Sequence, residues 1–449
     1  MLPSAPNSSL RSVGAGPRRE LPPRWDGNRR GSSLPLAFRL CAKDYLGGGG
    51  FAQTLGVRSY RSLFQTPEFT ALFATATLQV AGSTVTSLAM GTLIYAATRS
   101  PLLSALVMFG PSLSQMIGAV TLLSAADRLP PRAAMSAVAA AFAIGTAALA
   151  IPGLPVWSFF SVVAVLGLVA SISGGVRYGM LSEILPREGF ILGRSVLNMS
   201  VGTMQICGYA VGGVLVDVLS PRGTLLAGAS LDVVTAIVAM VGLSRRPPRA
   251  AGRPSIVQTL RVDAELWSSV PRRYTYLAMC VPNGLVVGCE SLFVAYSPRH
   301  AGLLFAFAAG GMLIGDTMTG RFIGPQWRQR LGPFMRFLLA APYLVFAIGP
   351  PLPLAAVAVM LASIGYCATL MLQERLLDLT PDPLHGQALG LQSSAMLTMQ
   401  GVGAALAGTI AQHTSAATAM VVMAVASITI TLILAPGLTS EPQRVLVRP

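Results

Sequence analysis

The stretch TMQICGYAVGG at residues 203–213 recurs as TMQGVGAALAG at residues 398–408. Thr, Met, Gln, Gly, Ala and Gly recur in register between the two copies. A second pair keeps the same order, with MLSE at 180–183 and MLQE at 371–374. Because the first stretch lies before the middle of the chain and the second lies after it, their similarity predicts two related structural halves. The alternative is chance similarity between helices rich in glycine and alanine.

The composition places the chain in a membrane. Of its 449 residues, 53% are hydrophobic and only 11% are charged, and the mean hydropathy is +0.63. Ordinary soluble proteins carry about a quarter charged residues. The five cysteines show neither pairing nor CxxC spacing, so they indicate neither a disulfide framework nor a zinc site. We therefore predict an integral membrane protein.

Twelve segments are long and apolar enough to cross a bilayer, which takes about 20 residues each. Turn-forming residues separate them, as in DRLPPR at 127–132 and TPDP at 380–383. The fold class is therefore an all-α membrane protein with twelve transmembrane helices in two halves. The predicted spans are 70–96, 101–124, 133–152, 155–181, 191–217, 223–243, 274–296, 301–322, 333–350, 353–374, 388–411 and 415–436.

An even number of spans places both termini on one side of the membrane. Of the 32 Lys and Arg residues, only Arg99, Arg222 and Arg299 fall in the loops assigned to the outer side. The excess of positive charge on the other side predicts cytoplasmic termini in the plasma membrane. The net charge of +15 is then a topology signal, and we expect no nucleic-acid partner.

The predicted domains follow from the spans and from composition. Residues 1–56 are rich in Pro, Gly, Arg and Ser without periodicity, which predicts disorder. An alternative is that translation starts near Val57. The organisation is a basic N-terminal extension (1–64), a six-helix bundle (65–243), a cytoplasmic central loop (244–273), a second six-helix bundle (274–437) and a cytoplasmic tail (438–449).

The stretch LLSAADRLPPRAA at 122–134 resembles a signature of the major facilitator superfamily, G-x-x-x-D-R-x-G-R-R after the second helix. It keeps Asp127, Arg128 and Arg132, but it has Leu123 in place of the glycine. The resemblance extends over about 65–440 and implies two pseudo-symmetric six-helix bundles. It also implies a cytoplasmic gate in which Asp127 pairs with a neighbouring helix end, while Arg128 and Arg132 contact acidic groups or lipid phosphates.

In the second half the corresponding stretch is GDTMTGRFIGPQWRQR at 315–330. It matches the signature only by position and basic charge. Asp316 and Arg321 are its candidate gate residues.

The antiporter branch of the superfamily has a fifth-helix signature ending in G-P-x-x-G-G. Here the segment reads GYAVGG, without the proline. The resemblance favours the bacterial exporters of drugs and small molecules. Glycines also permit close helix packing, which is the plainer interpretation. The residues concerned are Gly208, Gly212 and Gly213, with Gly403 and Gly408 in the second copy.

Glu290 lies in the otherwise uncharged stretch VPNGLVVGCESLFVAY, residues 281–296. A carboxylate facing lipid there would cost several kcal/mol. Asn283 is seven residues earlier and shares its helix face, while Gly284 and Gly288 form a second stripe suited to packing. In the family the first, fourth, seventh and tenth helices line a central cavity. We hypothesise that Glu290 faces that cavity and couples proton movement; the alternative is a structural, hydrogen-bonded glutamate.

Asp232, in the middle of the sixth span, is the second proton-coupling candidate. The alternative for this residue is a hydrogen bond between helices.

Four polar residues within other spans complete the candidate cavity lining with Asn283. Arg177 is suited to an anionic substrate or to pairing with Glu183. Gln205 and Gln400 are related by the repeat, and an amide both donates and accepts hydrogen bonds. Gln79 is a weaker candidate of the same kind. Helix-to-helix hydrogen bonding is the alternative role for these glutamines.

The pattern as a whole predicts a monomeric secondary transporter that exports a small amphipathic molecule by alternating access. The proton gradient is the expected energy source, with no cofactor, because the sequence has no GxxxxGK[ST] loop. Its three histidines are not arranged as metal ligands. The rivals are a substrate/proton symporter, a scaffold that has lost transport, and a membrane-embedded enzyme. An enzyme would need clustered catalytic side chains, which the sequence lacks.

Overall fold

The computed structural model describes residues 60–126, 129–185, 187–247 and 256–439. The predicted disorder of residues 1–56 lies outside these ranges, as do the gate candidates Asp127 and Arg128. All regular structure within the described ranges is helical. This is what a lipid environment demands, because a helix satisfies its own backbone hydrogen bonds.

The helices in chain order are α2 (Tyr60–Phe64), α3 (Pro67–Thr98), α4 (Pro101–Phe109), α5 (Pro111–Ala126), α6 (Pro131–Leu149), α7 (Val156–Ile184), α8 (Arg187–Gly242), α9 (Ile256–Ser268), α10 (Val270–Ser291), α11 (Phe293–Tyr296), α12 (Ala301–Arg321), α13 (Pro325–Leu338), η1 (Ala341–Ile348), α14 (Leu352–Ile364), η2 (Gly365–Cys367), α15 (Ala368–Asp378), η3 (Asp382–Leu384), α16 (His385–His413) and α17 (Ala416–Thr439).

Eleven helical stretches in the described part of the chain are long and apolar enough to span a membrane. One of them, Leu192–Gly242, has 51 residues. At 1.5 Å per residue it would extend about 77 Å, more than twice the bilayer core. Its backbone breaks at Ser220, whose φ is 69°, immediately before Pro221. The stretch is therefore two spans, and the twelve predicted spans are confirmed.

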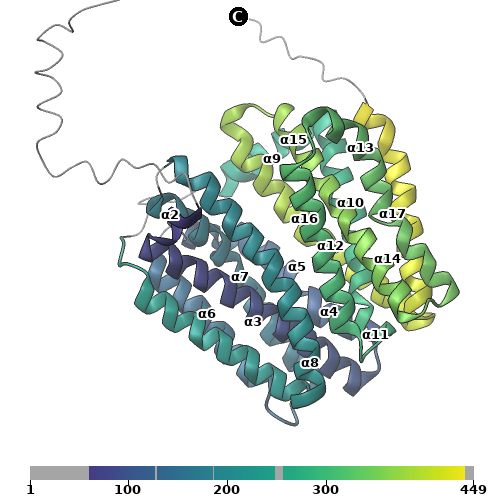
Figure 1. The fold of residues 1–449 in the computed structure, drawn as a ribbon, viewed down its shortest axis with the longest axis horizontal. Helices are drawn as coiled ribbons and strands as arrows, with labels where there is room; N and C mark the ends of the chain where they lie inside the picture. The colour runs from purple at the N-terminus through teal and green to yellow at the C-terminus, as the bar shows by residue number, and fades with distance from the viewer. Residues whose placement is uncertain (1–59, 127–128, 186, 248–255, 440–449) are drawn as a thin grey trace, which may run out of the picture. The chain divides into compact units, whose positions relative to one another are not determined.

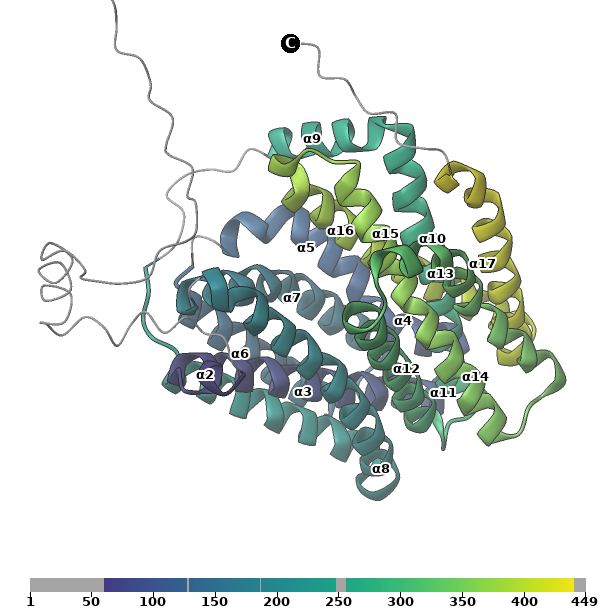
Figure 2. The ribbon, with the colours of Figure 1, turned by 45° about the horizontal axis from the view of Figure 1, so that its top comes forward.

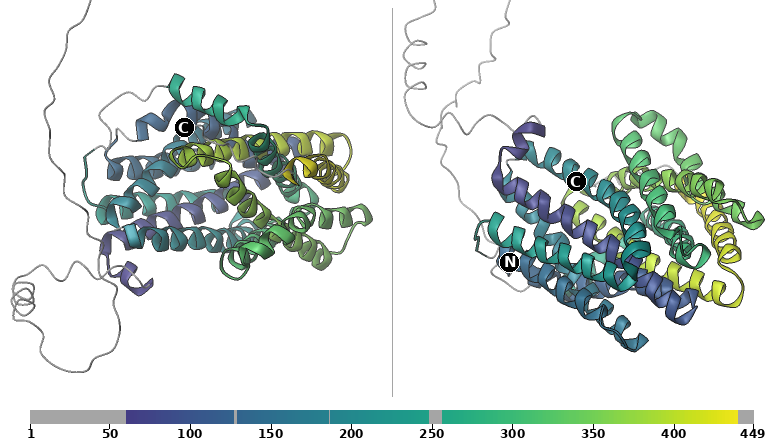
Figure 3. Two further views of the ribbon diagram at one scale, coloured as in Figure 1. Left: turned by 90° about the horizontal axis from the view of Figure 1, so that it is seen from above. Right: turned by 60° about the horizontal axis from the view of Figure 1, so that its bottom comes forward.

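The internal repeat is visible in the packing. In the first half α3 packs on α8, and α5 packs on α7; in the second half α10 packs on α16 and α17, and α12 packs on α14. The first span of each half thus contacts the fifth and sixth, and the second contacts the fourth. Figure 1 shows the two resulting groups, purple to teal and green to yellow, which stay distinct in Figures 2 and 3.

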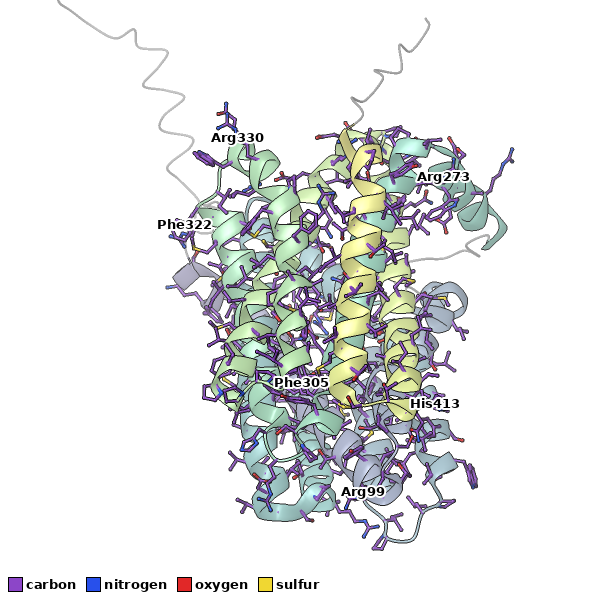
Figure 4. The ribbon with its side chains drawn as sticks, turned by 90° about the vertical axis from the view of Figure 1, so that its right-hand side faces the viewer. Arg99, Arg273, Phe305, Phe322, Arg330 and His413 are labelled. Atoms are coloured by element: carbon purple, nitrogen blue, oxygen red, sulfur yellow. The ribbon has the colours of Figure 1, made fainter. Side chains whose placement is uncertain are left out.

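The helices run between two ends. The end at which α3 begins and α17 finishes is called the terminal end here. Arg273 and Arg330 lie at the terminal end, while Arg99 and His413 lie toward the opposite end (Figure 4).

The two groups meet most extensively toward the opposite end. There α8 packs on α12, and α4 and α5 pack on α16. A Cβ added to Gly213 would lie 3.3 Å from Gly302 Cα, and one added to Gly408 would lie 2.7 Å from Leu102 Cα. Gly213 and Gly408 are equivalent positions of the repeat. The contact is therefore duplicated, and we call it the glycine seam.

The segment 244–273, predicted only as a central loop, contains the helix α9. Leu266 is fully buried, and the Trp267 ring stacks on Tyr276 at 5.9 Å between centroids. Figure 2 shows α9 lying across the end of α10. The sequence analysis missed this helix because it is too polar and too short to resemble a span.

We expect the glycine stripe of α10 to be essential for packing. A Cβ on Gly288 would lie 2.6 Å from the carbonyl oxygen of Gly403, a backbone atom that cannot move alone. Gly288→Ala should therefore lower the free energy of unfolding by about 1–3 kcal/mol, the usual cost of overpacking. Thermal unfolding of the two proteins in detergent measures this loss of stability.

The matched control is Gly310→Ala on α12, because nothing lies within 4 Å of a Cβ there. An unchanged melting temperature for Gly288→Ala would contradict the packing described.

Candidate functional site

Glu290 is buried within the second half of the molecule. Its side chain on α10 is 6% exposed, and the Tyr366 hydroxyl of η2 donates a hydrogen bond of 3.1 Å to its Oε1. This bond joins the seventh span to the tenth. In this structure protein therefore covers the carboxyl group, which the sequence analysis placed toward a cavity.

Aromatic rings from the two halves pack on each other beside the glycine seam. Phe293 packs edge-on against Phe305 with centroids 4.9 Å apart, and Tyr209 stacks on Phe305 at 4.7 Å. Tyr209 belongs to α8 of the first half, whereas Phe305 belongs to α12 of the second. Phe293 follows Glu290 by three residues in the chain. The buried carboxyl group is therefore adjacent to the contact between the two halves.

Two further polar groups lie in the same half without hydrogen-bond partners among the described residues. One is the hydroxyl of the fully buried Tyr343, within electrostatic range of Glu290. The other is Oδ1 of Asn283. An unpaired buried polar atom costs about 1–3 kcal/mol. Both groups therefore have unused hydrogen-bonding capacity inside the second half.

A second polar cluster lies in the first half. The Arg177 guanidinium on α7 donates to Gln79 Oε1 on α3 at 3.2 Å, and Gln79 Nε2 donates to Ser173 Oγ at 3.5 Å. The structure thus brings together two of the sequence candidates. The Arg177–Gln79 hydrogen bond joins the first span to the fourth, just as the Glu290–Tyr366 bond joins the seventh to the tenth.

Gln205 is directed between two helices of different halves. On α8, Gly202 faces Leu313 of α12 and Gly208 faces Thr84 of α3. At about 100° per residue Gln205 lies about 60° from each of these directions. Its amide makes no hydrogen bond to another described residue.

Gln400 occupies the equivalent position on α16. There Gly401 faces Leu113 of α5 and Gly403 faces Gly284 of α10. The same rotation places Gln400 about 60° from the direction of Gly403. The two repeat-related glutamines therefore have equivalent orientations, although no contact joins them.

Asp232 is not part of either cluster. It is 1% exposed, and its Oδ1 would lie 3.0 Å from a Cβ on Gly82 of α3. Its Oδ2 has no hydrogen-bond partner within the described ranges. Asp232 thus lies inside the first half, between the first and sixth spans. Gly212 of α8 also packs on α3, since a Cβ on Gly212 would lie 3.4 Å from Val85 Cα.

Ion pairs at the terminal end involve residues that the sequence analysis did not select as gate residues. Arg246 bonds Glu68 at 2.7 Å and Glu183 at 2.9 Å, and Arg328 pairs with Glu374. Glu183 and Glu374 are the glutamates of the repeated MLSE and MLQE motifs. The recurrence of these glutamates in the repeat is the sequence signal that could have identified them.

Among the residues selected for the gate, Asp316 and Arg321 are exposed, and neither forms an ion pair in the part of the chain described. Arg132 instead lines a cavity.

The histidines make local contacts. His385 Nε2 lies 2.9 Å from the Thr380 carbonyl oxygen, and His300 Nδ1 lies 3.1 Å from Ser297 Oγ. No group of three or more potential metal ligands occurs among the residues described.

The comparisons with known proteins agree with this geometry. The family model described as Major Facilitator Superfamily matches residues 72–373. The solved nucleoside transporter NupG is similar, at 16% identity and a TM-score of 0.67, over 83% of this chain and 100% of that one. No curated protein matches the chain significantly.

Two further solved structures share the fold. One is a bacterial homolog of the human lysosomal transporter Spinster, in an inward-facing and unoccupied conformation, at 15% identity and a TM-score of 0.64 over 85% of this chain and 97% of that one. The other is a POT family transporter in complex with 5-aminolevulinic acid, at 12% identity and a TM-score of 0.64 over 83% and 96%. At such identities these likenesses show the fold alone.

Tyr366→Phe removes the hydrogen bond to Glu290 while keeping the ring. We expect the free energy of unfolding to fall by about 1–2 kcal/mol, because the buried carboxyl group loses its donor. Tyr343→Phe is the matched control: its hydroxyl has no partner among the described residues, so removing it should cost little or nothing. Equal losses in thermal unfolding for the two variants would contradict the assignment.

Proposed function

The chain belongs to the major facilitator superfamily, and from that premise we propose that this secondary transporter is a proton-coupled exporter of a small amphipathic molecule, with Glu290 as its coupling carboxyl group. The observation that carries the proposal is the position of Glu290. It is buried, bonded to Tyr366 and next to the contact between the halves. An ionisable group inside a membrane protein is costly, and those that are kept mark ion pathways and proton relays.

The packing supports a proposal of alternating access. Two similar halves that rock about a central site expose it to one side at a time. The extensive contacts between the halves lie toward the opposite end, at the glycine seam. We propose that the terminal end is cytoplasmic, from the distribution of arginines. The structure then represents a state closed on the outer side.

Proton coupling requires that the carboxyl group change its surroundings during the cycle. Here Phe293, three residues after Glu290, packs on Phe305, which stacks on Tyr209 of the other half. Opening the seam separates Tyr209 on α8 from Phe305 on α12, which admits water to the carboxyl group. Glu290 would then exchange its proton with the outer side only when that side is open.

Substrate recognition is proposed for the groups directed between the halves. Gln205 and Gln400 offer amides from equivalent positions of the two halves, and the Gln79–Arg177 pair offers a cation held by an amide. Few polar groups in largely apolar surroundings suit a molecule with one polar and one apolar part. Arg177 further suggests that the polar part carries a carbonyl or an anionic group.

Export is proposed from the resemblance of GYAVGG to the antiporter signature. The close helix contacts of Gly208 and Gly213 are what packing alone would also require. The rival is a symporter that uses the same carboxyl group to import its solute. Both use the proton gradient, so only a flux measurement with a defined orientation separates them.

The test is proton flux driven by a panel of amphipathic compounds in proteoliposomes. Glu290→Gln should reduce this flux to the background level while still binding the compound, because the amide cannot release a proton. Outward movement of a compound against inward movement of protons identifies export, and movement of both in one direction identifies symport.

Asp232→Asn is the matched control, a second buried carboxyl group outside the clusters. It should retain coupled flux. If Glu290→Gln keeps normal flux and Asp232→Asn loses it, the coupling role belongs to Asp232 and our assignment is wrong.

A further inference from the structure

The contact between α8 of the first half and α12 of the second is built in layers. At the glycine seam Gly213 meets Gly302, and one turn nearer to the terminal end the ring of Tyr209 stacks on that of Phe305. The two ring planes are 19° apart. Figure 4 shows Phe305 toward the opposite end of the molecule, where the seam lies. The stacked pair is therefore the layer next to the seam, between it and the middle of the helices.

The other copy of the repeat has no aromatic pair at the equivalent layer. Tyr209 corresponds there to Ala404 of α16, and Ala105 of α4 follows the seam residue Leu102 by three positions, at the place of Phe305. Both alanines are fully buried. The halves thus pack together with methyl groups at this level on one side of the molecule and with aromatic rings on the other. Close packing therefore does not require the rings, and their chemistry needs a separate explanation.

Gln205 continues the surface that Tyr209 begins. It lies one turn nearer to the terminal end on α8 and about 40° around the helix from Tyr209. One turn beyond Phe305, α12 carries Ala309, whose side chain is a single methyl group. Neither the Gln205 amide nor the Tyr209 hydroxyl forms a hydrogen bond with another described residue. The boundary between the halves therefore carries an aromatic face beside two polar groups that bond nothing else in the described part of the chain.

Aromatic side chains bind flat ring systems in a way that aliphatic side chains do not. Offset stacking of two rings contributes free energy beyond that of area burial alone. Nucleic-acid bases stack on aromatic side chains in this way whatever their substituents. In the present state Tyr209 and Phe305 are each other's stacking partners. When the opposite end opens they separate, and a flat ring that lies against them restores the stacking that the opening removes.

We propose that Tyr209 and Phe305 form a stacking site for a planar aromatic ring of the transported molecule, and that Gln205 bonds a polar substituent of that ring. An amide both donates and accepts, so a carbonyl, hydroxyl or amine group suits it. The inference rests on the proposed function, because it narrows the small amphipathic substrate to one with a flat ring. It does not depend on proton coupling or on the direction of transport.

The test measures the binding of matched compound pairs to the full-length protein in nanodiscs by equilibrium dialysis. Each pair joins one polar group, an amine, a carboxamide or a carboxylate, to planar naphthalene or to its saturated form, decahydronaphthalene. In at least one pair the naphthalene compound should bind the wild type about three- to tenfold more tightly. Tyr209→Leu should abolish this preference by weakening the binding of the naphthalene compound alone. Tyr209→Phe should keep the preference, because the ring remains.

The matched control is Phe307→Leu, because Phe307 also belongs to α12 but lies about 160° around the helix from Phe305. This variant should retain the preference. Equal binding of both members of every pair by the wild type, or no binding of any compound, would overturn the stacking site. So would a preference that Tyr209→Leu leaves unchanged. If Tyr209→Leu does not fold, Phe305→Leu applies the same test from the other side of the stack.

Proton flux measured with the same compounds separates this inference from the proposed function. A naphthalene preference that depends on Tyr209, without any proton flux, would uphold the stacking site and contradict proton-coupled export. Proton flux driven equally by the naphthalene and the saturated compounds would uphold the coupling and overturn the stacking site.

Discussion

The close approach of backbones at the glycine seam is the contact on which the rest of the arrangement depends. Gly213 meets Gly302 and Gly408 meets Leu102, each at a distance that leaves no room for a larger side chain. In a bilayer, helices gain little from apolar burial, so small residues and the packing they permit decide which helices associate. The seam holds the two halves together at one end, and the rings of Tyr209 and Phe305 stack beside it across the two halves.

Much of the fold was predictable because its causes are local. Each span needs a run of about 20 apolar residues, and proline, glycine and arginine mark its ends. The repeat then implied two similar halves. The helix α9 was missed because its amphipathic pattern is short, and its packing includes the contact of Trp267 with Tyr276. Such a contact is visible only after the chain has folded.

The candidate site was predictable only in part. Sequence analysis selected Glu290, Gln79 and Arg177 because polar groups are expensive inside a membrane, and the structure joins the last two. It could not identify Tyr366 or Tyr209, since tyrosines are common in apolar spans and their roles here depend on which helices meet. The glutamates of the repeated motifs were visible in the sequence. Of their arginine partners, Arg246 lies in the central loop and Arg328 in the stretch 315–330, which matches the signature only by position and basic charge.

The central claim is that the two ends of the molecule open in alternation, and that the glycine seam separates when the opposite end opens. It is tested most directly by spin-label distances in a cysteine-free background, with one pair at Trp157 and Ile348 toward the opposite end and another at Ser182 and Arg330 at the terminal end. Shifting the pH or adding a transported compound should lengthen the first distance while it shortens the second. Distances that both stay constant during measured transport would contradict the account.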